Sequence, residues 1–316
     1  MQKGIKFRIY PNREQQNLIN QTLGCCRLIY NKGLAMRNEA YENGNKIGYS
    51  QTSSMLTELK KCEDFTFLKV VDSIALQQSL RDLDRGFVNF FQKRAAHPTF
   101  KSKHNRHQSY RTVNQGDNIR IVGNYIKLPK LGYVKIRQSM EVGKINNVTI
   151  EHTTTGRYFA VLNVEFKPQP RPNNGGRIGI DVGIKEFYSD SNGNVVSNPK
   201  FLEQSMRKLI REQRRLSRKQ KGSNNRNKQR VKVALVHEKI TNQRNDFLQK
   251  QSTMLICENQ TICIEDLKVK NMIRNHNLAQ HIGSAAWSKF FAMLTKCRRK
   301  APCFSNGDIR RLLLLN

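Results

Sequence analysis

Apolar and polar positions alternate in several short stretches of the chain, with the two-residue period of β-strands. The first stretch is GIKFRIY at residues 4–10, and further ones follow between about 118 and 166. Turn signals separate them, among them Gly123-Asn124 and Gly132. Several short strands at close spacing predict a small antiparallel barrel.

Two segments before residue 98 have the three- and four-residue spacing of amphipathic helices instead. Asn12, with Gln15 three residues on, predicts the capping box of a first helix. A second helix is predicted from about Asp72 to Arg94. Its apolar stripe is assigned to core packing and consists of Ile74, Leu80, Leu83, Phe87, Phe90 and Phe91.

The pattern changes after KPQPRPNNGG at 167–176, which predicts a linker. The stretch GRIGIDVGIKEF predicts a strand with isoleucines and valine on one face and Asp181, between two glycines, on the other. TICIEDL predicts a second strand in which Glu265 lies opposite the isoleucines. Two long helices are predicted between them, over 201–250, and such a crossover sets two parallel strands side by side. Asp181 and Glu265 are therefore expected on the same side of one sheet.

An acid in an apolar strand has two interpretations. Asp181 alone fits an ordinary strand end with an acidic cap and a turn glycine. With Glu265 beside it, the two acids fit a carboxylate pair that holds a divalent metal and acts on nucleic acid. The second acid favours the metal-site hypothesis.

The charge of the chain points to a polyanionic partner. It has 56 Lys and Arg against 24 Asp and Glu, a formal net charge of +32. No apolar run approaches the ~18 residues of a membrane helix, and no single amphipathic helix collects the charge. Nucleic acid is the expected partner, and no membrane association is expected.

Two basic segments are the candidate nucleic-acid contacts, although a solvated basic surface is the alternative for each. In the first, cations alternate with Phe100 and Tyr110, a composition suited to phosphates and stacked bases. The second is the first of the two long helices, where acids cannot balance the charge. The candidates are Lys101, Lys103, Arg106 and Arg111, and then Arg207, Arg211, Arg214, Arg215, Arg218 and Lys219.

Seven cysteines occur, an odd number with no CxxC pair. A disulfide framework is not expected, and the N-terminus has no secretory apolar segment, so we expect a reducing, cytoplasmic setting. Cys297 and Cys303 by themselves cannot complete a four-coordinate zinc site.

Six segments of the chain, spread from residue 3 to about 296, resemble in their order the TnpB (OrfB) proteins of bacterial insertion sequences. They are KFRIYPNREQQNLINQTLGCCRLIYNKGL, FKSKHNRHQSYRTVNQGDNIRI, LPKLGYVKI, GIDVGIKEF, HEKITNQRNDF and IEDLKVKNMIRNHNLAQHI. This family is also called a transposase family and is related to type V CRISPR effectors. The resemblance implies an RNA-guided DNA endonuclease with a RuvC-like domain of the RNase H fold.

The resemblance also implies a multidomain chain that combines α+β and α/β architecture. Residues 1–10 and 98–166 would form a wedge-type β-barrel. Residues 11–97 would be a helical recognition insert, often described as helix-turn-helix-like. After the linker at 167–176, residues 177–296 would be the RNase H-like RuvC domain, lacking its C-terminal part.

Residue by residue, Asp181 matches the acid of the first RuvC motif and Glu265 that of the second. In the family these acids bind Mg²⁺ (or Mn²⁺) for phosphodiester hydrolysis. The basic segments would hold a guide RNA derived from the transposon end and the target double-stranded DNA. The setting implied is the bacterial cytoplasm, with nucleoid association when DNA is bound.

Residues 297–316 depart from the family pattern. The cysteine pairs of its zinc ribbon are absent, and its third acid has no clear counterpart, because Asp308 is the sole acid after Trp287. We therefore expect a truncated or frameshifted copy with impaired cleavage and reduced stability. The alternatives are a catalytically inactive nucleic-acid-binding protein or repressor, and a decayed transposon remnant.

Overall fold

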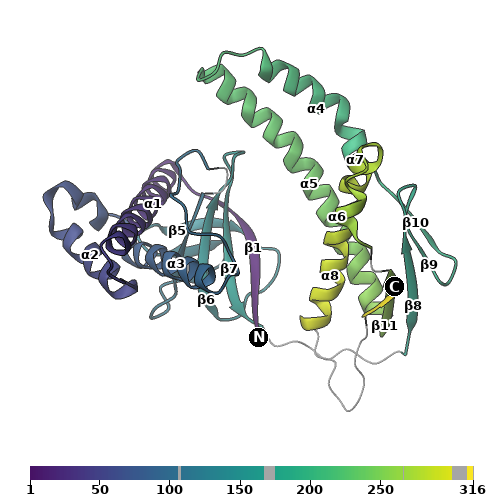
Figure 1. The fold of residues 1–316 in the computed structure, drawn as a ribbon, viewed down its shortest axis with the longest axis horizontal. Coiled ribbons are helices and arrows are strands. Elements are labelled where there is room, and N and C mark those ends of the chain that lie inside the picture. The colour runs from purple at the N-terminus through teal and green to yellow at the C-terminus, as the bar shows by residue number, and fades with distance from the viewer. Residues whose placement is uncertain (106–107, 167–174, 266, 301–311, 316) are drawn as a thin grey trace. The chain divides into compact units, whose positions relative to one another are not determined.

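The chain divides into two compact units, Met1–Phe166 and Lys167–Asn316, in a computed structural model (Figure 1). The structure describes residues 1–105, 108–166, 175–265, 267–300 and 312–315. Each unit has its own sheet and its own apolar core. No helix in the described ranges is long and apolar enough to cross a membrane.

The described part of the first unit contains a seven-stranded antiparallel sheet in the order β2-β6-β7-β1-β5-β4-β3. Its strands are β1 (Gln2–Tyr10), β2 (Gln108–Val113), β3 (Arg120–Val122), β4 (Tyr125–Leu128), β5 (Gly132–Arg137), β6 (Ile145–His152) and β7 (Tyr158–Glu165). β1 pairs with both β5 and β7, so the start of the chain folds with strands far along the sequence. The predicted antiparallel strands are present, and β2 is a strand that the pattern did not predict.

Helices of the first unit pack on this sheet (Figure 1). They are α1 (Arg13–Glu42), α2 (Tyr49–Lys61), the 3₁₀-helix η1 (Glu63–Lys69) and α3 (Ser73–Phe91). The predicted capping box is confirmed: Gln15 N donates to Asn12 Oδ1 at 2.8 Å, and Asn12 N donates to Gln15 Oε1 at 3.0 Å. Gln15 Nε2 also donates to the Leu131 and Tyr133 carbonyls, which fixes α1 against the segment around the start of β5.

One core assignment on α3 is wrong. Leu80, Leu83 and Phe87 are buried as predicted, but the Phe91 side chain is 67% exposed. Phe91 is the last residue of the helix, and helical periodicity gives the direction of a stripe without saying where packing partners end. The end of α3 therefore presents an aromatic ring to solvent.

The second unit, over its described residues, has a five-stranded sheet in the order β10-β9-β8-β11-β12. Its strands are β8 (Arg177–Val182), β9 (Glu186–Asp190), β10 (Val195–Ser197), β11 (Thr261–Glu265) and β12 (Leu312–Leu315). β8, β9 and β10 are antiparallel neighbours, whereas β11 runs parallel to both β8 and β12. The predicted parallel pairing of the two acid-bearing strands is confirmed.

Helices α4 (Phe201–Ser217) and α5 (Asn224–Glu258) form the crossover between β10 and β11, and α6 (Val269–Met272), α7 (His276–Ala285) and α8 (Trp287–Lys300) follow β11. The isoleucines of β8 and β11 pack with residues of α5 and α8 in the core, among them Leu255, Trp287 and Phe290. The core therefore lies on the predicted isoleucine face of the sheet. Asp181 and Glu265 belong to the other face, by the alternation of the strands.

Gly176 sets the position of β8 relative to β11. Its carbonyl accepts hydrogen bonds from Gln260 N at 2.7 Å and Thr261 N at 3.0 Å. A Cβ on this residue would lie 2.8 Å from the Glu258 carbonyl oxygen, so no other residue fits without a backbone shift. This close approach holds the two strand starts together and thereby fixes their register.

Candidate active site

The two predicted acids are neighbours at the ends of β8 and β11. Ile178 lies opposite Ile262 and Ile180 opposite Ile264, and in each strand the next residue is the acid. Residues at matching positions of adjacent parallel strands share a face, with backbones about 4.8 Å apart. Asp181 and Glu265 therefore lie side by side, and both are exposed.

Small residues lie around Asp181 on its face of the sheet, whereas the register partner of Glu265 on β12 is Leu315. Ser189 lies opposite Asp181 on β9, and Cys263 lies opposite Gly179. The backbone N–H of Gly179 donates to Ser191 Oγ at 3.1 Å, which joins β8 to the turn after β9. Glycine and serine at these positions leave Asp181 exposed.

The donor chemistry of this pair fits a hard divalent cation, because Mg²⁺ and Mn²⁺ prefer carboxylate and water oxygens. Two carboxylates at neighbouring positions repel each other, and a bound cation removes that repulsion. Among the residues that the structure describes, no group of three or more His, Cys, Asp or Glu could hold a metal ion. Within the described ranges, Asp181 and Glu265 are thus a pair of candidate ligands rather than a complete set.

A third acid close to this strand pair, Asp190, has a different role. Its carboxylate accepts hydrogen bonds at 2.9 Å from Asn192 N, Asn194 N and Asn194 Nδ2. The Asn194 side-chain bond is the main cause that lowers the pKa of Asp190. This acid closes the β9–β10 turn.

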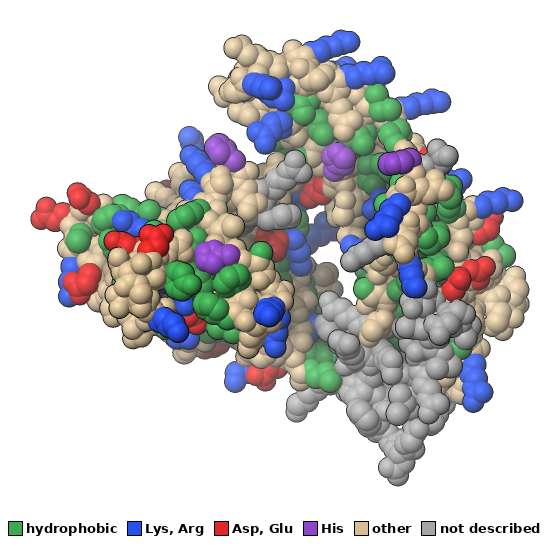
Figure 2. Space-filling view, viewed as in Figure 1, with side chains coloured by type: hydrophobic (Ala, Val, Ile, Leu, Met, Phe, Trp, Pro, Cys, Tyr) green, Lys and Arg blue, Asp and Glu red, His purple; other side chains and the backbone are tan. Residues whose placement is uncertain are grey.

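Helix α4 carries most of the second candidate basic segment on its exposed surface. Figure 2 shows Lys and Arg side chains projecting from the hairpin of α4 and α5. Arg207, Arg214 and Arg218 are exposed and, among the described residues, have no ion-pair partner. Lys219 is half-buried.

Two further arginines of α4 are paired with a buried acid. Arg215 Nη1 lies 3.3 Å and Arg211 Nε 3.6 Å from Glu212 Oε1. Gln229 Nε2, from α5, donates to Glu212 Oε2 at 2.7 Å. That hydrogen bond, with the two arginines nearby, lowers the pKa of Glu212. Arg211 and Arg215 are still mostly exposed, so they remain accessible to phosphates.

The first candidate basic segment differs, because two of its cations have partners within the unit. Lys101 Nζ lies 3.9 Å from the centroid of the Tyr30 ring, and burial lowers the pKa of its amine. Arg111 Nη2 donates to Asp82 Oδ1 and to Gln78 Oε1, an ion pair between β2 and α3.

The other candidates of this segment have no such partner among the described residues, or are not described. Lys103 is exposed, and Arg106 lies outside the described residues. Tyr110, which the sequence offered for base stacking, is buried, and burial raises its pKa.

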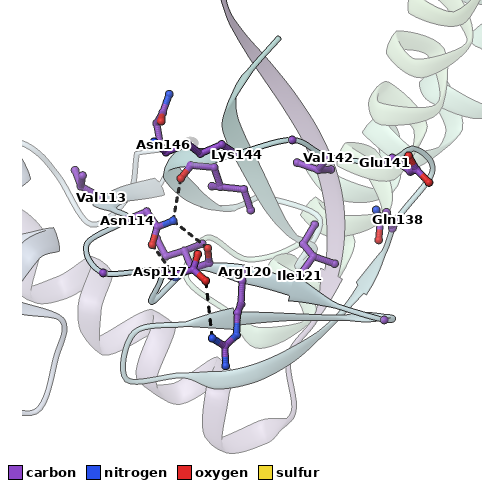
Figure 3. Close-up of a pocket in the computed structure, with 15 residues that line it drawn as sticks. Val113, Asn114, Asp117, Arg120, Ile121, Gln138, Glu141, Val142, Lys144 and Asn146 are labelled. Carbon is purple, nitrogen blue, oxygen red and sulfur yellow. Dashed lines mark hydrogen bonds and ion pairs between the residues drawn. The ribbon is translucent and has the colours of Figure 1, made fainter. Parts of the chain in front are cut away.

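Sequence reasoning missed a pocket of about 960 Å³ in the first unit (Figure 3). It lies between the β2–β3 and β5–β6 connections, where Asn114 joins the two sheet edges. Its Nδ2 donates to the Ile119 carbonyl at 3.1 Å and the Ile145 carbonyl at 2.9 Å, and its Oδ1 accepts from Ile119 N at 2.9 Å. The lining charges alternate in sign, as in the pair of Arg120 and Asp117 at 3.9 Å.

Comparison with known proteins gives matches along most of the chain. A family model described as "Probable transposase" matches residues 148–276, and one described as "Helix-turn-helix domain" matches residues 1–46. A putative RNA-guided DNA endonuclease of Streptomyces pristinaespiralis is 40% identical over 303 residues, which cover 94% of this chain and 75% of that protein. The putative RNA-guided DNA endonuclease InsQ of Escherichia coli K12 is 37% identical over 275 residues, 86% of this chain and 68% of its own.

The fold is that of a Cas12-like protein of mixed α/β type. The Cas12f1 chain of a complex with single guide RNA and target DNA aligns with a TM-score of 0.57 at 10% identity, over 99% of this chain and 89% of that one. With the family models and the two relatives, the chain belongs to the TnpB (OrfB) family of insertion-sequence proteins. The family predicted from the six motifs is confirmed.

Proposed function

We propose that this protein is a transposon-encoded, RNA-guided DNA endonuclease that hydrolyses phosphodiester bonds with a divalent metal ion. The observation that carries the proposal is the parallel pairing of β8 with β11, which brings Asp181 and Glu265 together. Two relatives at 40% and 37% identity are named as putative RNA-guided DNA endonucleases, which supports the same activity here.

The strand order supports a RuvC-like nuclease domain over residues 177–296. Three antiparallel strands followed by parallel ones, with the acids on β8 and β11, agree with the RNase H-like arrangement that the motifs imply. We propose residues 1–10 and 98–166 as the wedge barrel, in line with the pairing of β1 to β5 and β7. Residues 11–97 would be the recognition insert, and 167–176 the linker.

In the proposed mechanism, Asp181 and Glu265 hold the cation at the exposed end of the strand pair. A bound Mg²⁺ or Mn²⁺ would supply Lewis-acid activation of water and stabilisation of the leaving oxygen in phosphodiester hydrolysis. The two carboxylates fix the position at which the scissile phosphate is bound. The exposed cations of α4 hold the guide RNA and target DNA through their phosphates.

A second candidate is a nucleic-acid-binding protein or repressor without cleavage. The exposed Arg207, Arg214 and Arg218 support it, because phosphate binding by α4 does not require the acids. The expected impairment of this chain stays a prediction, since Asp308, the acid on which it depends, lies outside the described residues.

Cleavage of target DNA by the full chain tests the proposal, with RNA from the transposon end and Mg²⁺ or Mn²⁺. Asp181→Asn is expected to lower the rate at least about 100-fold, because a metal ligand is lost. Asp190→Asn is the matched control, since the Asn side-chain oxygen can still accept the two backbone hydrogen bonds of the turn, from Asn192 N and Asn194 N. RNA binding without cleavage by the unaltered chain would favour the second candidate, and cleavage that Asp181→Asn leaves unchanged would refute this active site.

A further inference from the structure

The end of α3 and the segment after it form a basic surface with exposed aromatic rings. Phe91 is 67% exposed and Phe100 59% exposed. Residues 85–116 contain no Asp or Glu. The Lys and Arg residues in that range are Arg85, Lys93, Arg94, Lys101, Lys103, Arg106 and Arg111.

The Phe91 ring rests on a packed support. It stacks against Phe87, with ring centroids 6.2 Å apart and planes 28° apart, and contacts Phe90 at 5.4 Å. The His97 ring meets both Phe87 and Phe90 edge-on, at 5.3 and 5.1 Å. Pro98 then packs against Gly86, where a Cβ would lie 3.3 Å from the Pro98 Cγ. The ring that faces solvent is therefore held by neighbours.

The support is also fixed from α1. Arg37 lies over the Phe87 ring at 4.0 Å and donates to Asp84 Oδ1 at 2.8 Å. Asp84 and Asp82, the acids closest in sequence to this surface, are thus paired with Arg37 and Arg111. Lys93 and Arg94, two and three residues after Phe91, are exposed and have no ion-pair partner among the described residues. The surface around Phe91 is accordingly electropositive.

An exposed aromatic ring with exposed cations two and three residues away suits a chain of nucleotides, because bases stack on the ring while phosphates contact the cations. An apolar peptide segment would gain nothing from the surrounding charge. RNA offers unpaired bases without strand separation, and recognition of unpaired RNA commonly uses aromatic stacking. The charge and the ring together favour single-stranded RNA as the occupant.

We propose that Phe91 is a base-stacking platform for an unpaired RNA segment, with Lys93 and Arg94 contacting the adjacent phosphates. The proposal rests on the proposed function only in that RNA is a partner of this protein. It gives the first unit a base contact that does not depend on the acids of the second. It also replaces the buried Tyr110 as the stacking residue of this region.

Fluorescence anisotropy of the full chain with a labelled single-stranded RNA tests this. Phe91→Ala should weaken binding about tenfold, within the range known for one stacked base, and leave the salt dependence unchanged because no charge is removed. Phe91→Trp should restore the affinity. Phe67→Ala is the matched control, an exposed aromatic (44%) of the same unit next to the acids of η1, and should have no effect.

Binding to the same RNA with abasic positions distinguishes stacking from a structural effect. The difference in affinity between the unaltered chain and the Phe91→Ala variant should disappear on the abasic strand. Equal affinity of both proteins for intact RNA, an equal loss on abasic RNA, or a loss confined to single-stranded DNA would each overturn the proposal. RNA binding that depends on Phe91 without DNA cleavage would refute the endonuclease proposal and keep this one.

Discussion

The two sheets of the molecule differ in the relative direction of their paired strands. In the first unit every pairing of the described strands is antiparallel, and Asn114 bridges the sheet edges with side-chain hydrogen bonds. In the second unit β8 and β11 are parallel and end at the same edge, each with an acid. Parallel strands that are distant in sequence end at the same edge of a sheet, and their acids meet there. The second sheet therefore supplies the candidate active site.

The two basic segments differ in a similar way. Lys101 and Arg111 are equal in charge to the cations of α4, yet one lies on Tyr30 and the other is paired with Asp82. Arg207, Arg214 and Arg218 have no such partners among the described residues. A count of charged residues along a sequence therefore overestimates the number of cations available to nucleic acid, because some cations stabilise the fold instead.

The largest effect is expected at the acid edge of the second sheet. Glu265→Gln should reduce DNA cleavage at least about 100-fold while leaving RNA affinity unchanged, since it removes a proposed metal ligand without altering α4. Cleavage and binding assays on the same preparation check this. A loss of RNA binding that matches the loss of cleavage would mean that metal binding by the acids and RNA binding by α4 are not separable in this way.

The next effect concerns the closure of the first sheet. Asn114→Ala should lower the free energy of unfolding of the first unit by about 2–3 kcal/mol, because it leaves backbone groups of Ile119 and Ile145 without their partner. Chemical denaturation measures it. Asn146→Ala, in the same pocket, is the control, and an equal change in both variants would contradict the bridging role.

The exposed cations of α4 should matter more than paired ones. Replacing Arg207, Arg214 and Arg218 together by Gln is expected to weaken RNA binding about tenfold and to reduce the salt slope by about 2. A triple variant at Lys6, Lys61 and Arg120, which have ion-pair partners, removes the same formal charge. If both triple variants lose affinity equally, net charge and not the α4 surface governs binding.

The smallest effect is expected at Arg111. Arg111→Met should lower stability by roughly 0.5–1 kcal/mol, because the ion pair with Asp82 is partly exposed. RNA affinity should stay within twofold. Thermal melting measures the stability and fluorescence anisotropy the RNA affinity. A large loss of affinity at unchanged stability would show that Arg111 binds nucleic acid.

The acid pair could be predicted from the sequence because few physical rules decide it. Strand alternation gives the face of Asp181 and Glu265, and a helical crossover makes their strands parallel. The pairing of Arg111 with Asp82 and the exposure of Phe91 depend on tertiary packing, which no local pattern contains. β2 was missed because QSYRTV is largely polar and lies in a segment that reads as a basic loop.

The central claim is that Asp181 and Glu265 bind one metal ion together, and calorimetric titration of the full chain with Mn²⁺ tests it most directly. The unaltered chain, Asp181→Asn, Glu265→Gln and the double variant would be compared. If both acids hold one ion, each single variant should lose at least about tenfold in affinity, and the double variant should lose little more than either. Binding that survives in the double variant, or single losses that simply add, would contradict a shared site.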